Sequence, residues 1–249
     1  MSTIDFLVRE TQKEFASVGI QDARLESELI WMAVLGLNRT NFFANLLTTV
    51  SVSDKEKAKI LTERRLQREP LAYLLGNREF YGLGFIMAPG SLIARNETEI
   101  LVEQVLKTAK TYPNEDGSLV IADVGTGSGV IAVSLAVELP EAEIFAIDVS
   151  EVPLTLAKRN AQLHEVSGRI RFLQGDLLHP LDRPVDLMVA NLPYVMSREI
   201  AGLDPEINQF EPILALDGGP DGLQIFRRLV SMVRGYIKPN ASLFFELDP

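Results

Sequence analysis

The first 75 residues have hydrophobic positions spaced as in amphipathic helices. One set recurs at helical intervals through Ile4, Leu7, Val8, Phe15 and Val18. A second set lies between residues 25 and 33, and such spacing gives a helix one apolar face. A third helix is predicted from Ser53, because Glu56 stands three residues later and would complete a capping box. We therefore predict that residues 1–75 form a helical domain.

The pattern changes after this domain. Aromatic residues flank glycines in residues 79–85 and predict a short β-hairpin, within a linker over residues 76–96. A helix is then expected from Glu97, followed by a polar, turn-rich segment at 112–118. Short apolar runs predict strands at 119–123, 144–148, 170–173, 185–190 and 242–247, and helical patterns separate them at 130–137, 153–163 and 223–237. Apolar strands alternating with helices predict a parallel sheet covered on both faces, and hence an α/β domain over residues 97–249.

A glycine-rich turn follows the first of these strands, with the sequence Asp123-Val-Gly125-Thr126-Gly127-Ser128-Gly129. Glycines at a strand-to-helix junction let the backbone turn tightly and approach a ligand closely. Asp148 ends the second strand and could accept hydrogen bonds from ribose hydroxyls. A phosphate-binding loop is excluded, because no Gly-x4-Gly-Lys-Ser/Thr is present. A serine hydrolase elbow is excluded too, because it needs glycines two positions before and after the serine, where Ser128 has Thr126 and Val130. The turn alone is compatible with a dinucleotide or with S-adenosylmethionine.

Asn191-Leu192-Pro193-Tyr194 follows the fourth strand directly. The lone pair of an amide or arylamine nitrogen is delocalised, and it must be localised before the nitrogen can attack a sulfonium methyl group. The Asn191 side-chain oxygen and the Leu192 backbone carbonyl could accept both N–H bonds of an NH2 group. Pro193 would stiffen the turn, and Tyr194 could stack on a planar substrate. Together with the glycine turn, this favours an S-adenosylmethionine-dependent methyltransferase that acts on a planar nitrogen.

Composition limits the possible sites and partners. The absence of cysteine and the presence of two histidines argue against a disulfide or a metal site. The formal net charge of −10 argues against broad affinity for nucleic acid or anionic membrane. We interpret Arg64, Arg65 and Arg68 as one solvated helix face. The chain has neither a signal-peptide pattern nor an apolar run of about 18 residues, so we expect a cytoplasmic protein.

Several segments resemble the HemK/PrmC family, the methyltransferases that modify the glutamine amide of peptide-chain release factors. Besides the helical domain and the two motifs above, the similar segments are residues 70–76, 79–82, 89–90, 95–102, 175–177, 211–212, 215–219 and 221–223. The resemblance implies a class I S-adenosylmethionine-dependent methyltransferase fold, which is Rossmann-like with a mostly parallel sheet. It also implies that the N-terminal helical-bundle domain recognises the substrate.

The resemblance further implies the site residues and the reaction. Cofactor-binding residues would be Asp123, Gly125, Thr126, Gly127, Ser128, Gly129, Asp148, Asp176, Leu177 and Asn191. The substrate would contact Asn191, Leu192, Pro193 and Tyr194, with Asn191, Pro193 and Tyr194 as the catalytic residues. The substrate would be the Gln of a Gly-Gly-Gln loop in a class 1 release factor, and the product N5-methylglutamine. We expect a monomer that makes no direct contact with nucleic acid.

The sequence departs from the family pattern at three places. Leu192 and Asn96 each replace a proline, and we expect somewhat less rigid turns there. The chain also stops at Pro249, soon after the fifth strand, where the family continues through a helix and an antiparallel strand pair. We therefore expect an incomplete C-terminal end.

Three other functions stay open at this point. Asn-Leu-Pro-Tyr also resembles the motif of ribosomal RNA adenine dimethylases, so the first is an adenine-N6 methyltransferase acting on RNA or DNA. The second is a cofactor-binding fragment that lacks catalysis because of Leu192 or truncation. The third is a nicotinamide-dependent dehydrogenase, because the glycine turn fits both kinds of cofactor.

Overall fold

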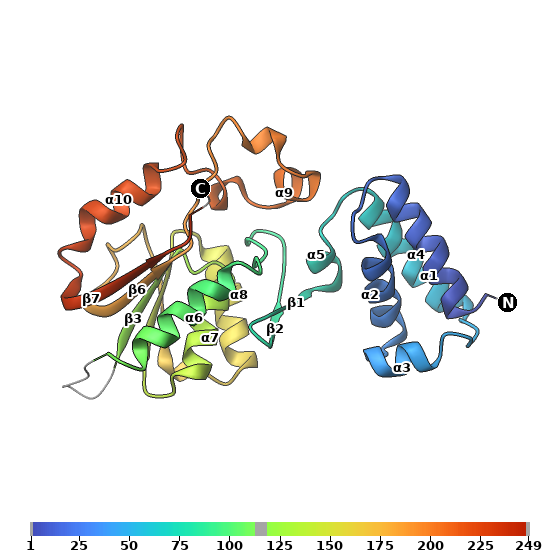
Figure 1. The fold of residues 1–249 in the computed structure, drawn as a ribbon, viewed down its shortest axis with the longest axis horizontal. Coiled ribbons are helices and arrows are strands. Elements are labelled where there is room, and N and C mark those ends of the chain that lie inside the picture. The colour runs from blue at the N-terminus through green and yellow to red at the C-terminus, as the bar shows by residue number, and fades with distance from the viewer. Residues whose placement is uncertain (1, 113–118, 248–249) are drawn as a thin grey trace. The chain divides into compact units, whose positions relative to one another are not determined.

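The computed structural model describes residues 2–112 and 119–247 (Figure 1). Except for Tyr112, the polar segment predicted at 112–118 lies outside these residues. The chain forms two compact units, Met1–Gly76 and Asn77–Pro249. Among the described residues, no helix has the length and apolar character needed to cross a membrane.

The first unit is helical, as predicted. Its helices are α1 (Ile4–Ser17), α2 (Ala23–Leu35), α3 (Arg39–Ala44), α4 (Val52–Leu66) and α5 (Leu71–Leu75). Phe15 and Ile30 are fully buried in one apolar cluster, and Trp31 and Phe42 are buried in another. In α1 the buried Ile4, Val8 and Phe15 belong to the predicted apolar face. In α2 the prediction is wrong, because Leu25 and Ala33 are exposed and the buried side chains include Ile30 and Trp31 instead.

The capping box predicted for α4 is wrong. The residue that caps this helix is Ser51, whose hydroxyl accepts a hydrogen bond from the Asp54 N–H at 3.1 Å and donates one to the Asp54 carboxylate at 2.8 Å. Ser53 already lies inside the first turn. Asp54 accepts from the Ser51 hydroxyl, whereas in a capping box the acidic side chain accepts from the backbone N–H of the capping residue.

The prediction that the three arginines form one solvated face is also wrong for Arg65. This side chain is 4% exposed, and its Nη2 donates to Glu26 Oε1 at 3.1 Å while Nε donates to Oε2 at 2.5 Å. The two-point bond links α4 to α2. A guanidinium can be buried at this position because a carboxylate matches its planar geometry.

The second unit opens with the predicted hairpin, formed by β1 (Asn77–Phe80) and β2 (Leu83–Ile86). A parallel sheet follows in the order β5-β4-β3-β6-β7. Its strands are β3 (Val120–Val124), β4 (Glu143–Asp148), β5 (Ile170–Gln174), β6 (Val185–Ala190) and β7 (Ile237–Phe245). The α/β, Rossmann-like fold is therefore confirmed. Ile237 belongs to β7, although the helical pattern assigned it to the preceding helix.

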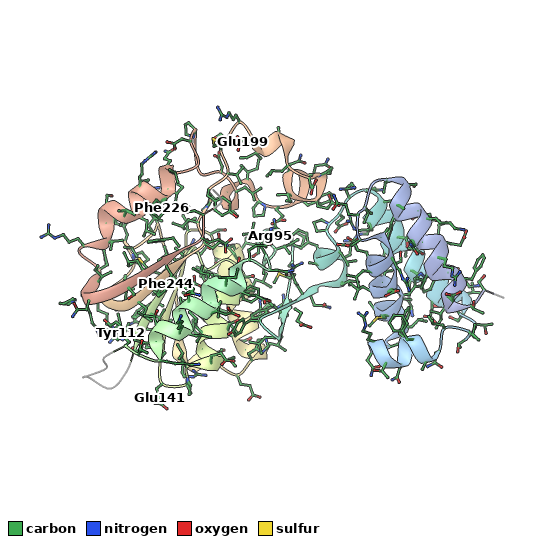
Figure 2. All side chains as sticks on the ribbon, in the orientation of Figure 1. Arg95, Tyr112, Glu141, Glu199, Phe226 and Phe244 are labelled. Carbon is green, nitrogen blue, oxygen red and sulfur yellow. The ribbon has the colours of Figure 1, made fainter. Side chains whose placement is uncertain are left out.

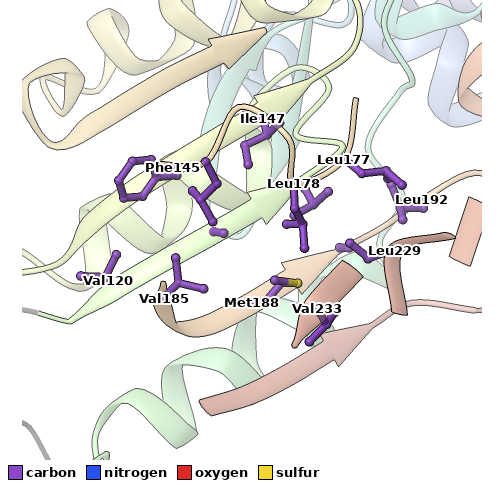
Figure 3. Packing of buried hydrophobic residues seen from close by; sticks show 14 residues of the cluster. Val120, Phe145, Ile147, Leu177, Leu178, Val185, Met188, Leu192, Leu229 and Val233 are labelled. Atoms are coloured by element: carbon purple, nitrogen blue, oxygen red, sulfur yellow. The ribbon is translucent and has the colours of Figure 1, made fainter. Parts of the chain in front are cut away.

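Helices cover both faces of this sheet. One layer holds α6 (Thr98–Ala109), α7 (Val130–Glu138) and α8 (Glu151–Leu163). On the other face, Leu229 and Val233 of α10 (Gln224–Val233) pack with Met188 of β6 in one buried cluster (Figure 3). The short helix η1 (Ser167–Arg169) precedes β5. Between β6 and α10 lies an excursion that the sequence pattern did not predict, with η2 (Ile200–Gly202), α9 (Pro205–Phe210) and η3 (Ile213–Ala215).

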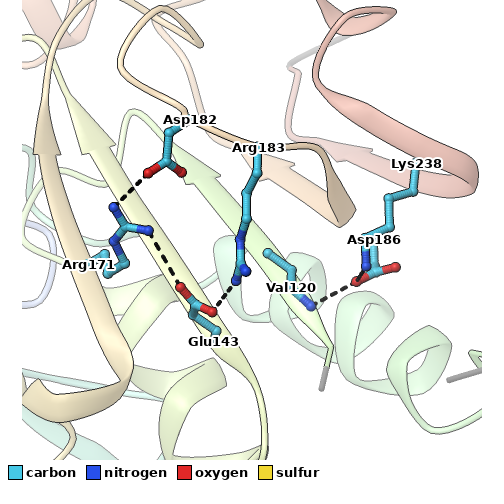
Figure 4. A network of polar contacts seen from close by, with 7 residues as sticks. All are labelled: Val120, Glu143, Arg171, Asp182, Arg183, Asp186 and Lys238. Atoms are coloured by element: carbon cyan, nitrogen blue, oxygen red, sulfur yellow. Dashed lines mark hydrogen bonds and ion pairs between the residues drawn. The ribbon is translucent and has the colours of Figure 1, made fainter. Parts of the chain in front are cut away.

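Charged side chains connect the amino ends of the strands (Figure 4). Asp186 Oδ2 accepts hydrogen bonds from the Val120 N–H and from Lys238 Nζ, each at 2.9 Å, and so joins β6 to β3 and β7. On the neighbouring strands, Glu143 pairs with Arg171 and with Arg183. The charged groups at the amino ends therefore pair with one another. In an open α/β sheet, ligands bind at the carboxyl ends of the strands, which is the opposite edge.

Asp123 places a carboxyl group inside the sheet with no exposed surface. Its Oδ2 accepts hydrogen bonds from Thr126 Oγ1 at 2.6 Å and from the Ala132 N–H at 3.1 Å. Within the described residues, Oδ1 has no partner. Burial raises the pKa of this carboxyl group to about 7, although the two hydrogen bonds oppose the shift.

Asn160 of α8 is fully buried and joins three segments. Its Oδ1 accepts from the Ile86 N–H at 2.8 Å. Its Nδ2 donates to the Ile86 carbonyl at 3.1 Å and to the Ser128 carbonyl at 2.9 Å. One amide thus connects the hairpin and the glycine turn to α8.

We expect Asn160→Ala to lower the free energy of unfolding by about 1–3 kcal/mol, because it leaves the Ile86 and Ser128 backbone groups buried without partners. Urea denaturation followed by circular dichroism measures the change. Gln162→Ala, at an exposed position of the same helix, should change it by less than about 0.5 kcal/mol. Equal effects of the two substitutions would contradict the role of Asn160.

Asp123→Asn should remove a pH dependence of stability. The native state keeps its proton on Asp123 up to about pH 7, whereas the ordinary value of 3.8 means that the unfolded chain releases it earlier. The free energy of unfolding of the wild type should therefore fall by about 4 kcal/mol as the pH rises from about 4 to 7. The variant should lack this fall. Denaturation at several pH values tests it. Asp182→Asn is the control, because Arg171 lowers the pKa of Asp182 below this pH range. If the stability of wild type and of Asp123→Asn changes with pH in the same way, the expectation is wrong.

Candidate active site at the carboxyl edge of the sheet

A cavity of about 440 Å³ lies at the carboxyl ends of β3, β4 and β6. It is large enough for a cofactor-sized ligand. Of the residues predicted for the site, those that line it are Gly125, Thr126, Gly127, Ser128, Asp148, Asp176, Leu177, Asn191, Leu192 and Pro193. Asp123, Gly129 and Tyr194 do not line it. The fold therefore brings most of the predicted residues to one place.

Two glycines of the turn are required by packing. Gly125 has φ +78°, and a Cβ there would lie 2.8 Å from Leu192 Cδ2. Gly129 has φ +82°, and a Cβ there would lie 2.8 Å from the Ala157 Cβ of α8. The turn thus runs between Leu192 and α8 where no side chain would fit. Asp123 lies beneath it and holds Thr126, so its contribution to the cavity is indirect.

Asp148 lies at the cavity wall with both carboxylate oxygens in use. Oδ2 accepts from the Gly127 N–H at 3.0 Å, and Oδ1 accepts from the Ser150 N–H at 2.9 Å. Burial raises the pKa of this carboxyl group, and the backbone hydrogen bonds oppose that shift. A carboxylate oxygen can accept more than one hydrogen bond, so Asp148 can still accept from ligand hydroxyls.

The wall at the end of β5 combines a strained residue with an ion pair. Leu177 is buried at φ +52°, a conformation that a branched side chain rarely adopts. Next to it, Asp176 pairs with Arg228 of α10, and both side chains line the cavity. Sequence reasoning did not identify Arg228, because nothing in its local pattern distinguishes it from a solvated helix residue.

Asn191 lines the cavity one residue beyond β6. Its Nδ2 donates to Glu246 Oε1 at 2.8 Å and to Thr98 Oγ1 at 3.2 Å. Among the described residues, none donates to its Oδ1. The amide oxygen is therefore the polar atom that Asn191 can offer to a ligand. Sequence reasoning did not identify Thr98 or Glu246 as parts of the site.

The segment after Asn191 packs against a glycine-rich stretch. A Cβ on Gly218 would lie 2.7 Å from the Pro193 carbonyl oxygen, and one on Gly222 would lie 2.3 Å from the Tyr194 carbonyl oxygen. Residues 218–222 therefore support the motif through backbone contact. Tyr194 is half-buried and lies outside the cavity lining, so its stacking on substrate stays a prediction.

A buried glutamate connects two segments of the cavity wall. Glu211, whose side chain is 1% exposed, accepts from Arg95 Nη2 at 2.6 Å and from the Ile93 N–H at 3.1 Å. Arg95 itself lines the cavity and is labelled in Figure 2. Both stretches contributed to the family resemblance, which was the available signal, although no role followed from it.

Known proteins are similar to this chain over both of its units. Residues 7–76 match the model of the PrmC N-terminal domain, and residues 95–203 match that of the methyltransferase small domain. The release factor glutamine methyltransferase of Geobacter sulfurreducens is 38% identical over 98% of this chain and 84% of that protein. The enzyme of the same name from Moorella thermoacetica is 39% identical over 96% and 83%, respectively.

A human relative shares the similarity. The MTRF1L release factor glutamine methyltransferase of Homo sapiens is 36% identical over 94% of this chain and 73% of that protein. Identity at this level across both units goes beyond a shared fold. The chain belongs to the release factor glutamine methyltransferase family.

Proposed function

We propose that this protein transfers a methyl group from S-adenosylmethionine to the side-chain N5 of the Gln in the Gly-Gly-Gln motif of class 1 peptide chain release factors. The observation that carries the proposal is the placement of Asn191. Its amide lines the cavity beside the glycine turn, with Nδ2 bound by protein and Oδ1 left to accept. Family membership supports the same reaction.

The cavity residues fit an adenosyl cofactor. Asp148 offers acceptor oxygens for the two ribose hydroxyls, and the apolar Leu177, Val149 and Ile225 line the same cavity and could cover the adenine ring. The glycine turn gives backbone access on the β3 side. When bound, the cofactor supplies an electrophilic methyl group on a positively charged sulfur.

The substrate nitrogen needs two acceptors, because its lone pair is shared with the neighbouring carbonyl. Asn191 Oδ1 and the Leu192 backbone carbonyl can each accept one of the two N–H bonds, which draws electron density to the nitrogen. The transfer would form an N–CH3 bond as the S–CH3 bond breaks, would leave S-adenosylhomocysteine, and would release one proton from the nitrogen to water. The protein's main contribution is to hold the nitrogen in line with the methyl group.

The other candidate functions are not favoured. The relatives named above are release factor methyltransferases over nearly the full chain, and a net charge of −10 suits an RNA or DNA enzyme poorly. The Asn191 amide lines the cavity with its Nδ2 held by Thr98 and Glu246, which supports an active enzyme over a protein that only binds the cofactor.

Methylation of a purified class 1 release factor tests the proposal. With S-adenosylmethionine, wild-type protein should add one methyl group to the motif glutamine, as read by mass spectrometry of its peptide. Asn191→Ala should lower kcat by about 10²- to 10³-fold, because an oriented group at the reacting centre is lost. Asn208→Ala is the matched control, since that amide donates to backbone carbonyls of the excursion. Label in ribosomal RNA but not in the release factor would overturn the proposal.

Asp148→Asn should weaken cofactor binding by about 10- to 100-fold, because an NH2 group replaces one oxygen that now accepts a backbone N–H. Isothermal titration calorimetry with S-adenosylhomocysteine measures the dissociation constant.

Wild-type affinity should also fall as the pH drops through the raised pKa of Asp148, since a protonated carboxyl loses acceptor capacity. Asp182→Asn, at the opposite edge of the sheet, should bind like wild type. Unchanged affinity in Asp148→Asn would contradict the assigned role.

A further inference from the structure

We propose that Thr98 and Glu246 are positioning residues that hold the Asn191 amide in the one orientation useful for methyl transfer. This inference rests on the proposed function, because it assigns how the same site is kept ready. Neither side chain needs to touch substrate or cofactor. Each acts through its hydrogen bond to Asn191 Nδ2.

A side-chain amide has two nearly isosteric ends, and only one of them suits the substrate. If Asn191 rotated by half a turn about its terminal bond, its NH2 group would face the substrate NH2 group, donor against donor. Glu246 prevents this, because a carboxylate oxygen accepts and cannot donate to a carbonyl oxygen. Thr98 Oγ1 accepts the second N–H, so both donors of the Asn191 amide are satisfied on the protein side.

The fold places these two residues independently of each other. Ala190 pairs with Phe245 in the parallel register of β6 and β7, and the Glu246 N–H donates to the Ala190 carbonyl at 3.2 Å. Asn191 directly follows β6 and Glu246 directly follows the adjacent β7, so the two residues are neighbours. Thr98 is the first residue of α6 and is 2% exposed. Sheet register sets one contact, and the start of a helix sets the other.

Glu246 has a second feature that fits a role in the reaction. Its Oε2 is buried and has no partner among the described residues. A buried oxygen without a donor is costly, yet it lies on the group that binds Asn191. Methyl transfer brings positive charge to the substrate nitrogen. A carboxylate behind the Asn191 amide would polarise Oδ1 and stabilise that charge.

The test uses the full chain with Thr98→Val, Thr98→Ser and Glu246→Gln, assayed on the release factor under steady-state conditions. We expect Thr98→Val and Glu246→Gln to lower kcat by about 10- to 100-fold through misorientation, with the KM for S-adenosylmethionine changed by less than about twofold. Thr98→Ser keeps the acceptor and should retain most of the activity. Controls on the same helix are Thr108→Val and the exposed Glu103→Gln, which should behave like wild type.

A second readout does not depend on turnover. The side-chain NH2 resonances of Asn191 in the ¹⁵N-labelled protein should show slow hydrogen exchange in wild type and faster exchange in Glu246→Gln and Thr98→Val. If the wild type is active and both Glu246→Gln and Thr98→Val match its kcat and its exchange rate, the positioning role is wrong and the proposed function stands. Equal losses in Thr98→Ser and Thr98→Val, or a KM that rises in step with the loss of kcat, would also overturn it. A folded wild type that never methylates the release factor would overturn the proposed function, while the exchange data would still test the orientation.

Discussion

The parallel register of β6 between β3 and β7 is the constraint on which the site depends. It sets Ala190 beside Val124 on one side and beside Phe245 on the other. The next residue of each strand is therefore part of the site: Gly125 opens the glycine turn, Asn191 carries the amide, and Glu246 binds that amide. A shift of one residue in β6 would turn Asn191 toward the other face of the sheet and separate it from both neighbours.

Three unfavourable local features lie at this edge of the sheet. Leu177 has a left-handed backbone, Asp123 has a buried oxygen without a donor, and Glu246 has another. At the opposite edge, Asp186 and Glu143 are fully engaged by basic side chains and backbone. The paired charges of the amino edge thus serve stability, whereas the three features of the carboxyl edge lie where we propose that ligands bind.

Whether a feature could be predicted from the sequence depends on how far apart along the chain its interacting residues lie. Strands such as β3 and β6 are short apolar runs, so local pattern was sufficient to find them. The glycine turn and Asn191 were found because their chemistry is local as well. Thr98 and Glu246 lie 93 and 55 residues from Asn191, and neither is unusual in its own segment. Arg65 was misplaced for the same reason, since its partner Glu26 lies 39 residues away.

Leu192 shows how packing can replace a local restraint. A proline at this position would stiffen the turn through its ring, and its loss predicted a looser loop. In the structure the Leu192 side chain is buried, and its Cδ2 occupies the space that a Cβ on Gly125 would need. The restraint thus comes from contact between the two motifs instead of from the backbone of one. It follows that the glycine at 125 and the leucine at 192 constrain each other, because a Cβ at the first position would lie 2.8 Å from the Leu192 Cδ2 and would force that side chain to move.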